Sequence, residues 1–350
     1  MNGGCLREYS PHTSETSLPV ILRTETKHMS DTIDGAATPA PQLPPKRPEK
    51  KRNRTGWIVG IVVVAVAIIV AAVLIIVNIT APKSAEAAPI VVKIGTSDSS
   101  QPYWAILKEK ALAQGIDIEP VNFSDYSQPN PALEQGQIDM NIFQHLRFLS
   151  QYNVDTGNDL EPIASTLISP LGLYSQKWKT LADIPQGGTI AIPNDPSNQS
   201  RALFVLQSAG LLKLTGDKFA PTPADIDAAN SKVKVVTVDA AQTVLSMASV
   251  DGSVVNGNYV LDAKIDPKSA LYADDPNAPG AQPYINLIVV RAADINNPIY
   301  QKVADLYHDP DVLNSVLAAS NGTSVIVQGF DGPKLRDLLK TIEAQVTASN

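Results

Sequence analysis

Cysteine is nearly absent from this chain of 350 residues, which contains only Cys5. A disulfide bond requires two cysteines and a cysteine-based metal centre usually requires several, so a single chain forms neither. Histidine is scarce as well, with four residues, which leaves little for a metal centre built from imidazoles. We therefore expect no metal and no cofactor.

Common catalytic motifs are also missing. The sequence contains no His-Glu-x-x-His, Gly-x-Ser-x-Gly, Gly-x-x-x-x-Gly-Lys or Cys-x-x-Cys, which are signatures of metalloproteases, serine hydrolases, phosphate-binding loops and redox or metal sites. These absences favour a binding protein over an enzyme. An enzyme is the alternative from another class. It would show turnover that survives the loss of Arg201 but not the loss of an acid or a serine.

The large C-terminal part of the chain has no excess of basic residues. The formal net charge is −7, and residues 1–56 carry nine Lys and Arg against six Asp and Glu, so the remainder carries −10. Because nucleic acids are bound by basic surfaces, we expect no nucleic-acid partner.

One long apolar run is present, at Ile58–Val77, and it contains no charge. At about 1.5 Å per residue, its length of roughly 30 Å matches the hydrocarbon core of a bilayer. The basic stretch KRPEKKRNR precedes it, and such flanks stay in the cytoplasm. We expect a protein of the cell membrane with four parts: a disordered cytoplasmic tail at 1–56, a single-pass transmembrane helix at 57–78, a tether at 79–89 and an extracytoplasmic solute-binding domain at 90–350.

A cleaved signal peptide is the alternative interpretation of the same run, because Ala85-Glu86-Ala87 has the spacing of a cleavage site. The apolar part of a signal peptide usually has about 7–15 residues, and this run is longer. The length favours a helix that is retained as a membrane anchor.

Segments with strand and helix patterns alternate from residue 90 onward. VVKIGTS is followed by the helical PYWAILKEKALAQG, and TIAIPND is followed by SRALFVLQSAGLLKL. This alternation predicts parallel α/β sheets. We expect two α/β lobes with a cleft between them: lobe 1 at about 90–175 plus 285–350, and lobe 2 at about 176–284.

Aromatic residues make up only 5% of the chain, yet Tyr126, Phe143 and His145 cluster where predicted strands end. Ligands of open parallel sheets bind beyond the carboxyl ends of the strands. These three side chains are therefore candidates to line an apolar pocket in the cleft. The alternative is structural: Phe143 lies in the core, and His145 begins the next helix and faces solvent.

The second lobe offers polar candidates. PNDPSNQSRALF predicts a helix with Ser197 or Asn198 as its cap and Arg201 in the first turn. Free N–H groups and an arginine at this position favour an anion, which an arginine grips with two hydrogen bonds. A surface ion pair is the alternative for Arg201.

Asparagines and acids supply the remaining polar candidates. Asn256 and Asn286 interrupt apolar runs, and their amides both donate and accept hydrogen bonds, which suits a zwitterionic amino acid. We interpret Asn258 as a turn residue. Asp274 and Asp275 lie in a Pro/Gly-rich loop and are interpreted as solvated surface.

Several of these stretches resemble the methionine-binding, NlpA-type family of solute-binding proteins, which deliver ligands to ABC importers. FSDYSQPNPALEQGQIDMNIFQH is similar to that family's most specific stretch, and IAIPNDPSNQSRAL, LFVLQSAGLLKL, VVNGNYV and PYINLIVVR follow in the expected order. The resemblance covers about Val91 to the C-terminus.

The resemblance implies a two-lobed periplasmic-binding-protein-like fold that binds an amino acid, L-methionine in the first place, and docks on an ABC permease with its ATPase. It implies that aromatic residues enclose the ligand side chain, Arg201 binds the α-carboxylate, and two asparagines hold the amino and carboxylate groups. The residues so implied are Tyr126, Phe143, His145, Arg201, Asn256 and Asn286.

The chain departs from the family pattern in two places. Most family members are anchored through a lipidated cysteine after a signal peptide; here Cys5 has no apolar segment before it, so we expect the transmembrane helix to take the place of the lipid anchor. The first loop, TSDSSQPYW, also differs, so Tyr103 and Trp104 are candidates to reach the cleft, although packing at the base of the first helix is favoured for both. Another small ligand, such as a methionine-containing dipeptide, and a ligand-sensing receptor are the alternative functions.

Overall fold

The computed structural model describes residues 54–80 and 88–349, and the chain forms two compact units, Met1–Pro82 and Lys83–Asn350. Cys5, the predicted tail up to residue 53, the basic stretch before the apolar run except Arg54, and most of the predicted tether lie outside the described residues.

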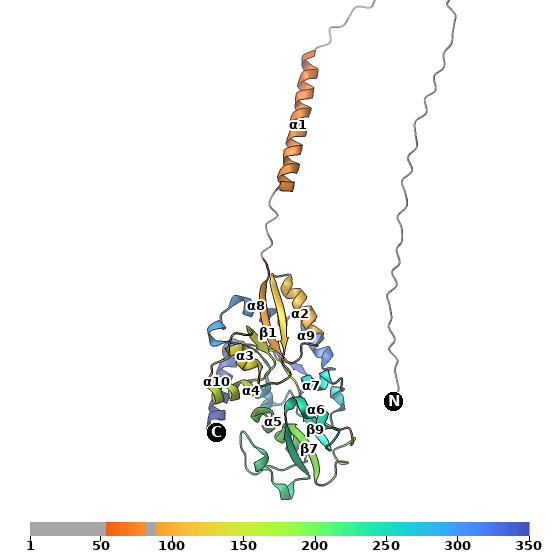
Figure 1. The fold of residues 1–350 in the computed structure, drawn as a ribbon, viewed down its shortest axis with the longest axis vertical. Helices are drawn as coiled ribbons and strands as arrows, with labels where there is room; N and C mark the ends of the chain where they lie inside the picture. Colours follow the sequence, from red (N-terminus) through yellow and green to blue (C-terminus); the bar gives the residue numbers. More distant parts are fainter. Residues whose placement is uncertain (1–53, 81–87, 350) are drawn as a thin grey trace, which may run out of the picture. The chain divides into compact units, whose positions relative to one another are not determined.

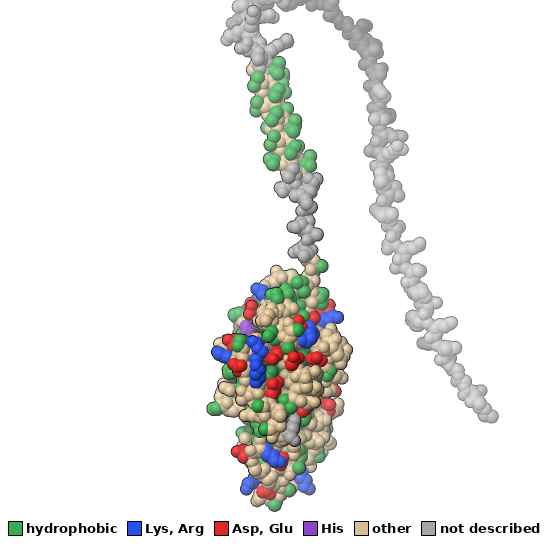
Figure 2. All heavy atoms as spheres, turned by 90° about the vertical axis from the view of Figure 1, so that its left-hand side faces the viewer, with side chains coloured by type: hydrophobic (Ala, Val, Ile, Leu, Met, Phe, Trp, Pro, Cys, Tyr) green, Lys and Arg blue, Asp and Glu red, His purple; other side chains and the backbone are tan. Residues whose placement is uncertain are grey.

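The first unit contains one described element, the helix α1 (Arg54–Thr80). Its window Gly56–Ile76 is long and apolar enough to cross a membrane, and its side chains are exposed. Figure 2 shows the helix covered with hydrophobic side chains, whereas charged side chains are spread over the visible face of the other unit. A helix that is apolar all round needs an apolar environment, which agrees with the predicted helix at 57–78.

The second unit contains two five-stranded sheets (Figure 1). The first sheet has the order β2-β1-β3-β11-β4. Its second strand, at Ile90–Thr96, alternates in burial: Val92 and Ile94 are buried, while Lys93 between them points to solvent. The strands are β1 (Ile90–Thr96), β2 (Ile116–Asn122), β3 (Met140–Ile142), β4 (Glu161–Ser165) and β11 (Leu287–Val290).

The second sheet has the order β10-β6-β9-β7-β8. Its strands are β6 (Gly172–Tyr174), β7 (Gly188–Pro193), β8 (Val233–Val238), β9 (Gly252–Val255) and β10 (Tyr272–Ala273). A separate antiparallel pair joins β5 (Leu167–Ile168) to β12 (Val325–Ile326).

Helices cover both sheets, and each sheet with its helices is one lobe. Lobe 1 contains α2 (Tyr103–Leu112), α3 (Pro129–Glu134), α4 (Leu146–Thr156), α8 (Pro298–Tyr307), α9 (Pro310–Ala319) and α10 (Gly332–Ser349). Lobe 2 contains α5 (Pro196–Ser208), α6 (Thr243–Ser246) and α7 (Gly257–Asp262). Short 3-10 helices lie at Pro223–Asp225, Ala228–Asn230, Ala240–Gln242, Pro267–Ser269, Pro279–Tyr284 and Ala292–Asp294.

The predicted two-lobed α/β architecture is confirmed. The chain returns to the first sheet with β11. Figure 1 shows the C-terminal helices α8 and α9 beside β1 and α2 in that lobe. The prediction of parallel sheets holds for β1 with its two neighbours and for β7 with its two neighbours. It is wrong for β6 and β11, which are antiparallel to their partners because they enter their sheets from the crossings between the lobes.

The chain crosses from lobe 1 to lobe 2 between β5 and β6, and it returns between β10 and β11. Pairing places β6 in the second sheet, a few residues before the boundary expected near residue 175. Each lobe has its own core. Buried strands and α2, α8 and α9 form the main cluster of lobe 1, and β7 with α5 forms that of lobe 2. The lobes therefore face each other as two separately packed bodies.

Candidate functional site

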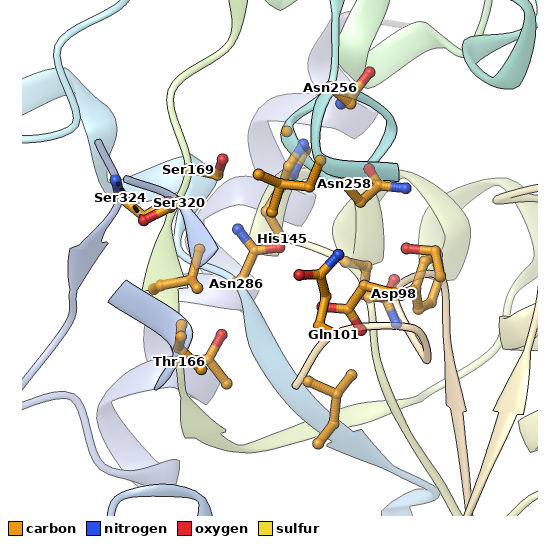
Figure 3. A pocket seen from close by; sticks show the side chains of 18 of the residues that line it. Asp98, Gln101, His145, Thr166, Ser169, Asn256, Asn258, Asn286, Ser320 and Ser324 are labelled. Atoms are coloured by element: carbon orange, nitrogen blue, oxygen red, sulfur yellow. Dashed lines mark hydrogen bonds between the residues drawn. The ribbon is translucent and has the colours of Figure 1, made fainter. Parts of the chain in front are cut away.

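A cavity of about 140 Å³ lies between the two lobes. Figure 3 shows Asp98, His145, Asn258 and Asn286 around the same space. A cavity of this size holds several waters or one small molecule. All six residues selected from the sequence line it, namely Tyr126, Phe143, His145, Arg201, Asn256 and Asn286. Their role in ligand binding stays a prediction.

One wall of the cavity is aromatic. The ring centroids of Tyr126 and Phe143 lie 6.1 Å apart, and Phe148 lies 5.7 Å from Phe143 and 6.1 Å from Tyr126 in edge-to-face contact. Phe148 also lines the cavity and was not selected from the sequence. Its position three residues after His145 on a helix was the available signal, because residues at that spacing share a face. The rings offer an apolar surface for a side chain.

His145 caps α4 rather than facing solvent. Its side chain is only 6% exposed, and its Nδ1 accepts the backbone N–H of Phe148 at 3.1 Å. Burial, with help from the Arg201 charge, lowers the pKa of His145 to about 3, so the ring is neutral near pH 7. Because Nδ1 accepts, the hydrogen is on Nε2, which donates to Oδ1 of Asn198 at 3.4 Å.

A chain of amides continues from this histidine into lobe 2. The Asp195 carboxylate only accepts hydrogen bonds, and it accepts one from Nδ2 of Asn198 at 2.9 Å. Oδ1 of Asn198 therefore points the other way, and it accepts a hydrogen bond from Nδ2 of Asn256 at 2.9 Å. This order leaves Oδ1 of Asn256 as a buried acceptor without a partner in the described chain. A cationic amino group is the kind of donor it fits.

Asn258 is a wall residue of the cavity, so its interpretation as a simple turn residue is wrong. It lies in the first turn of α7, where its Oδ1 accepts the hydroxyl of Tyr126 from lobe 1. Its Nδ2 is buried and has no partner among the described residues, which makes it a free donor. Asn256 and Asn258 thus present one free acceptor and one free donor from the same short segment.

Arg201 is buried, and its preferred hydrogen-bonding edge is already used. Its Nε and Nη2 bind the two carboxylate oxygens of Asp274 at 2.7 and 3.1 Å, and Nη2 also donates to the Ser169 carbonyl at 2.9 Å. The guanidinium lies 4.1 Å from the centre of the Tyr284 ring. Nη1 makes no hydrogen bond within residues 88–349 and is the group available to a ligand.

Three predictions around Arg201 are corrected by this geometry. The cap of α5 is Asp195, not Ser197 or Asn198, and Arg201 lies in the second turn. The free N–H groups at the helix start therefore serve Asp195. Asp274 is not solvated surface, because it neutralises a buried guanidinium, while Asp275 is exposed as expected.

Asn286, in the return crossing, is held by the backbone at the start of β5. Its N–H donates to Leu167 and its carbonyl accepts from Thr166, each at 2.8 Å, and it forms a β-bridge with His145. The side chain donates to the Tyr284 carbonyl at 3.4 Å. The residue therefore places a polar group where lobe 1 meets the return crossing.

The first loop contributes Asp98, which was not selected from the sequence. Its carboxylate accepts the Tyr103 hydroxyl at 3.0 Å, the Trp104 indole N–H at 3.1 Å and the Thr96 hydroxyl at 2.5 Å. Burial raises the pKa of Asp98 in spite of these bonds. Trp104 packs in the core at the base of α2, as favoured, whereas Tyr103 both packs there and reaches the cavity wall.

The site combines an aromatic wall, a neutral imidazole, free amide groups and one partly available guanidinium. This set suits a small molecule that has an apolar end and a polar, charged end. Among the described residues, no group of three or more His, Cys, Asp or Glu side chains is arranged to hold a metal ion.

Two α/β lobes that contribute residues from both sides to one small cavity define a solute-binding protein fold. Residues 92–327 match the NlpA lipoprotein family. The chain belongs to this family.

Similar proteins agree with this assignment. The chain is 33% identical over 246 residues to the D-methionine-binding lipoprotein MetQ of Yersinia pestis, which covers 69% of the chain and 89% of that protein. The substrate-binding protein of a methionine transporter from Streptococcus pneumoniae is 38% identical, with a TM-score of 0.63, covering 68% of this chain and 95% of that one. A nutrient-binding protein of Burkholderia cenocepacia bound to methionine is 35% identical, with a TM-score of 0.63, covering 67% and 99%.

Proposed function

We propose that the protein is the membrane-anchored, extracytoplasmic substrate-binding component of an ABC importer, and that it binds methionine or a related amino acid in the inter-lobe cavity without catalysis. The observation that carries the proposal is the pairing of an aromatic wall with free polar groups in one cavity. Methionine is the first candidate ligand, because relatives of this chain are named for methionine, the one from Yersinia pestis for D-methionine. Both enantiomers are therefore tested, with L-methionine taken first.

The cavity supports a specific orientation of the amino acid. In this orientation the methionine side chain lies against Tyr126, Phe143 and Phe148. Contact of its thioether sulfur with aromatic rings adds a modest stabilisation to that from burial of apolar surface. The amino group donates to Oδ1 of Asn256, and the carboxylate accepts from Nη1 of Arg201. His145 and Asn286 close the wall between the two ends of the ligand.

Hydrogen bonds across the cavity support a mechanism of lobe closure. Tyr126 reaches Asn258, the Tyr259 hydroxyl donates to the Ser124 carbonyl at 2.8 Å, and Ser100 donates to Asp262 at 2.9 Å. These bonds join loops of lobe 1 to α7 of lobe 2, so they form only when the lobes are together. In the proposed mechanism, ligand stabilises this arrangement by a hinge motion, and the closed form docks on the permease and its ATPase.

The apolar helix α1 supports the proposed anchor. Its window of 21 residues from Gly56 matches the length that a bilayer core requires. In the proposed topology the helix crosses the membrane once, with the N-terminus in the cytoplasm and residues 90–350 outside.

Calorimetric titration of the fragment 88–350 tests the ligand. All described strands and the buried cores lie within this fragment. The fragment is unfolded, washed and refolded to remove co-purified ligand, then titrated with L- and D-methionine, other amino acids and methionine-containing dipeptides. Selective binding of methionine supports the proposal. Binding of another class of molecule alone, or of none, contradicts it.

A further inference from the structure

The inter-lobe cavity has a second end that the proposed orientation of methionine does not use. The aromatic wall, with Phe148 on α4, lies toward the face of the first sheet on which α3, α4 and α10 pack. The second end belongs to the opposite face, where the core is built with α2, α8 and α9. It is named the acidic end here, and its lining residues are Asp98, Gln101, Tyr103, Thr166, Tyr307 and Ser320.

Asp98 gives this end its charge. Among the described residues that line the cavity it is the one acid, and the residue keeps accessible surface there. Figure 3 shows Asp98 beside Gln101, with Thr166 and Ser320 on the other side of the space. A ligand in the cavity can therefore reach the Asp98 carboxylate.

The hydrogen bonds of Asp98 leave one carboxylate oxygen largely open. Oδ1 accepts the Thr96 hydroxyl at 2.5 Å, the Tyr103 hydroxyl at 3.0 Å and the Trp104 indole N–H at 3.1 Å. Oδ2 lies 3.2 Å from the same Tyr103 hydroxyl, whose single hydrogen is shared between the two oxygens. All three donors are neutral, so they orient the carboxylate without balancing its charge.

No cation of the described chain balances this charge either. Asp98 has no Lys, Arg or His within ion-pair distance, and Arg201, the base that lines the cavity, is paired with Asp274. Burial raises the pKa of Asp98, and the charge of Asp262 at the end of α7 adds to this shift. A bound cation would stabilise the carboxylate, because burial disfavours a charge that has no opposite charge nearby.

We propose that the acidic end binds an ammonium group of the ligand, which donates to Oδ2 of Asp98 while the ligand carboxylate accepts from Arg201. This ammonium group is distinct from the nitrogen beside the carboxylate, which faces Asn256 in the proposed orientation. The ligand class is an amino acid with a cationic side chain or a dipeptide, whose amino terminus carries the charge. Because the same cavity is used, this assignment rests on the proposed function, and it makes Asp98 a residue that determines specificity.

Calorimetric titration of the full chain in detergent micelles, washed free of co-purified ligand, tests this assignment. Two pairs of probes differ only in the ammonium group: glycyl-methionine with N-acetylglycyl-methionine, and lysine with Nε-acetyllysine. Methionine is the reference ligand. We expect the wild type to bind the ammonium member of at least one pair at least about tenfold more tightly than the acetylated member, as for a hydrogen bond between charged groups. The pair that shows this preference identifies the source of the ammonium group.

Asp98→Asn keeps the shape of the side chain and removes its charge. It should reduce the preference for the ammonium member to less than about threefold, while the affinity for methionine changes by less than about threefold. Asp275→Asn is the matched control, because Asp275 is an exposed acid that does not line the inter-lobe cavity. This variant should keep the wild-type preference.

Two results would overturn the assignment and leave the proposed function intact, provided that methionine binds. The first is equal affinity of the wild type for both members of each pair, a comparison that needs no variant. The second is a preference that Asp98→Asn retains in full. If the wild type binds neither methionine nor any other probe, the proposed function fails and the assignment of the acidic end fails with it.

Discussion

His145 and Asn198 meet across the inter-lobe cavity, with Nε2 of the imidazole 3.4 Å from Oδ1 of the amide. One residue caps a helix of lobe 1 and the other lies in the first turn of a helix of lobe 2. This geometry requires a neutral imidazole with its hydrogen on Nε2, since Nδ1 accepts a backbone N–H. Protonation would place a second hydrogen on Nδ1 and break the cap of α4, while Nε2 would still donate to Asn198, so it is the cap that depends on the protonation state of the ring.

Stability should fall in acid because of His145. Its pKa is about 3 in the folded chain and about 6.5 when unfolded, so between these values the unfolded state binds more protons. The free energy of unfolding consequently falls as pH drops from 6.5 toward 3. Between pH 7 and pH 4.5, the loss from this residue should be about 2–3 kcal/mol.

Urea unfolding of the 88–350 fragment at both pH values measures this loss. The variant His145→Gln should show a pH-dependent loss that is smaller by that amount. Asp98 and Asp195, whose pKa values are raised by burial, act in the opposite direction, but they are present in both proteins and cancel in the comparison. His308→Gln, at the end of α8, is the matched control. Equal pH dependence of wild type and His145→Gln would contradict the assignment.

Substitution of Arg201 should mainly weaken ligand binding, whereas substitution of Asp274 should mainly lower the free energy of unfolding. Arg201→Ala removes the available Nη1 and should weaken methionine binding by a few kcal/mol, because a desolvated carboxylate loses its partner. Asp274→Asn keeps that cation but leaves it without its counterion, so it should lower the free energy of unfolding by on the order of 3 kcal/mol while affinity changes less than tenfold.

Urea unfolding and calorimetry on the same preparations measure the two effects. Lys110→Ala, which breaks surface ion pairs with Asp309 and Asp311, is the control and should change neither quantity appreciably. If Arg201→Ala bound methionine with wild-type affinity, the proposed contact between Arg201 and the ligand carboxylate would be contradicted.

Asn256 should be required for recognition of the amino group. Asn256→Ala removes the free Oδ1 and also leaves Asn198 without one donor, so methionine affinity should fall at least about tenfold. A methionine analogue that lacks the amino group should bind wild type and variant equally well. Asn277→Ala, in an exposed loop, is the matched control. If the variant discriminates against the analogue as strongly as wild type does, another group binds the amine.

The helix α1 should make the full chain an integral membrane protein. After expression in a bacterial host, the full chain should remain in the membrane pellet during alkaline carbonate extraction, because a spanning apolar helix is not released by high pH. The fragment 88–350 should be soluble under the same conditions. Recovery of the chain in the supernatant, or cleavage near Ala87, would show that the helix is not retained as an anchor.

Local patterns in the sequence were sufficient to predict the lobes and one wall of the cavity. Tyr126, Phe143 and His145 were found because residues after parallel strands gather at one sheet edge. The directions of β6 and β11 were not predictable in this way, since a run of three or four buried residues has the same pattern in either direction.

Contacts between distant residues explain the rest of what was missed. Arg201 and Asp274 are 73 positions apart, and the loop composition around Asp274 indicated only exposure. Asp98 follows β1 in a polar loop, and only the packing of α2 brings the Tyr103 hydroxyl and Trp104 indole onto its carboxylate. Partners of this kind depend on tertiary structure, which no short pattern contains.

The two crossings between the lobes limit how the binding domain can move. Two lobes joined by a single linker could rotate about several axes relative to each other. Two lobes joined by two crossing segments rotate most easily about the line through both segments. Asp274 lies at the start of the return crossing and forms an ion pair with Arg201 of α5. This ion pair holds the start of the crossing against lobe 2. In the proposed hinge motion, a ligand that engages Arg201 would therefore act beside the return crossing, at an ion pair that already joins this crossing to α5.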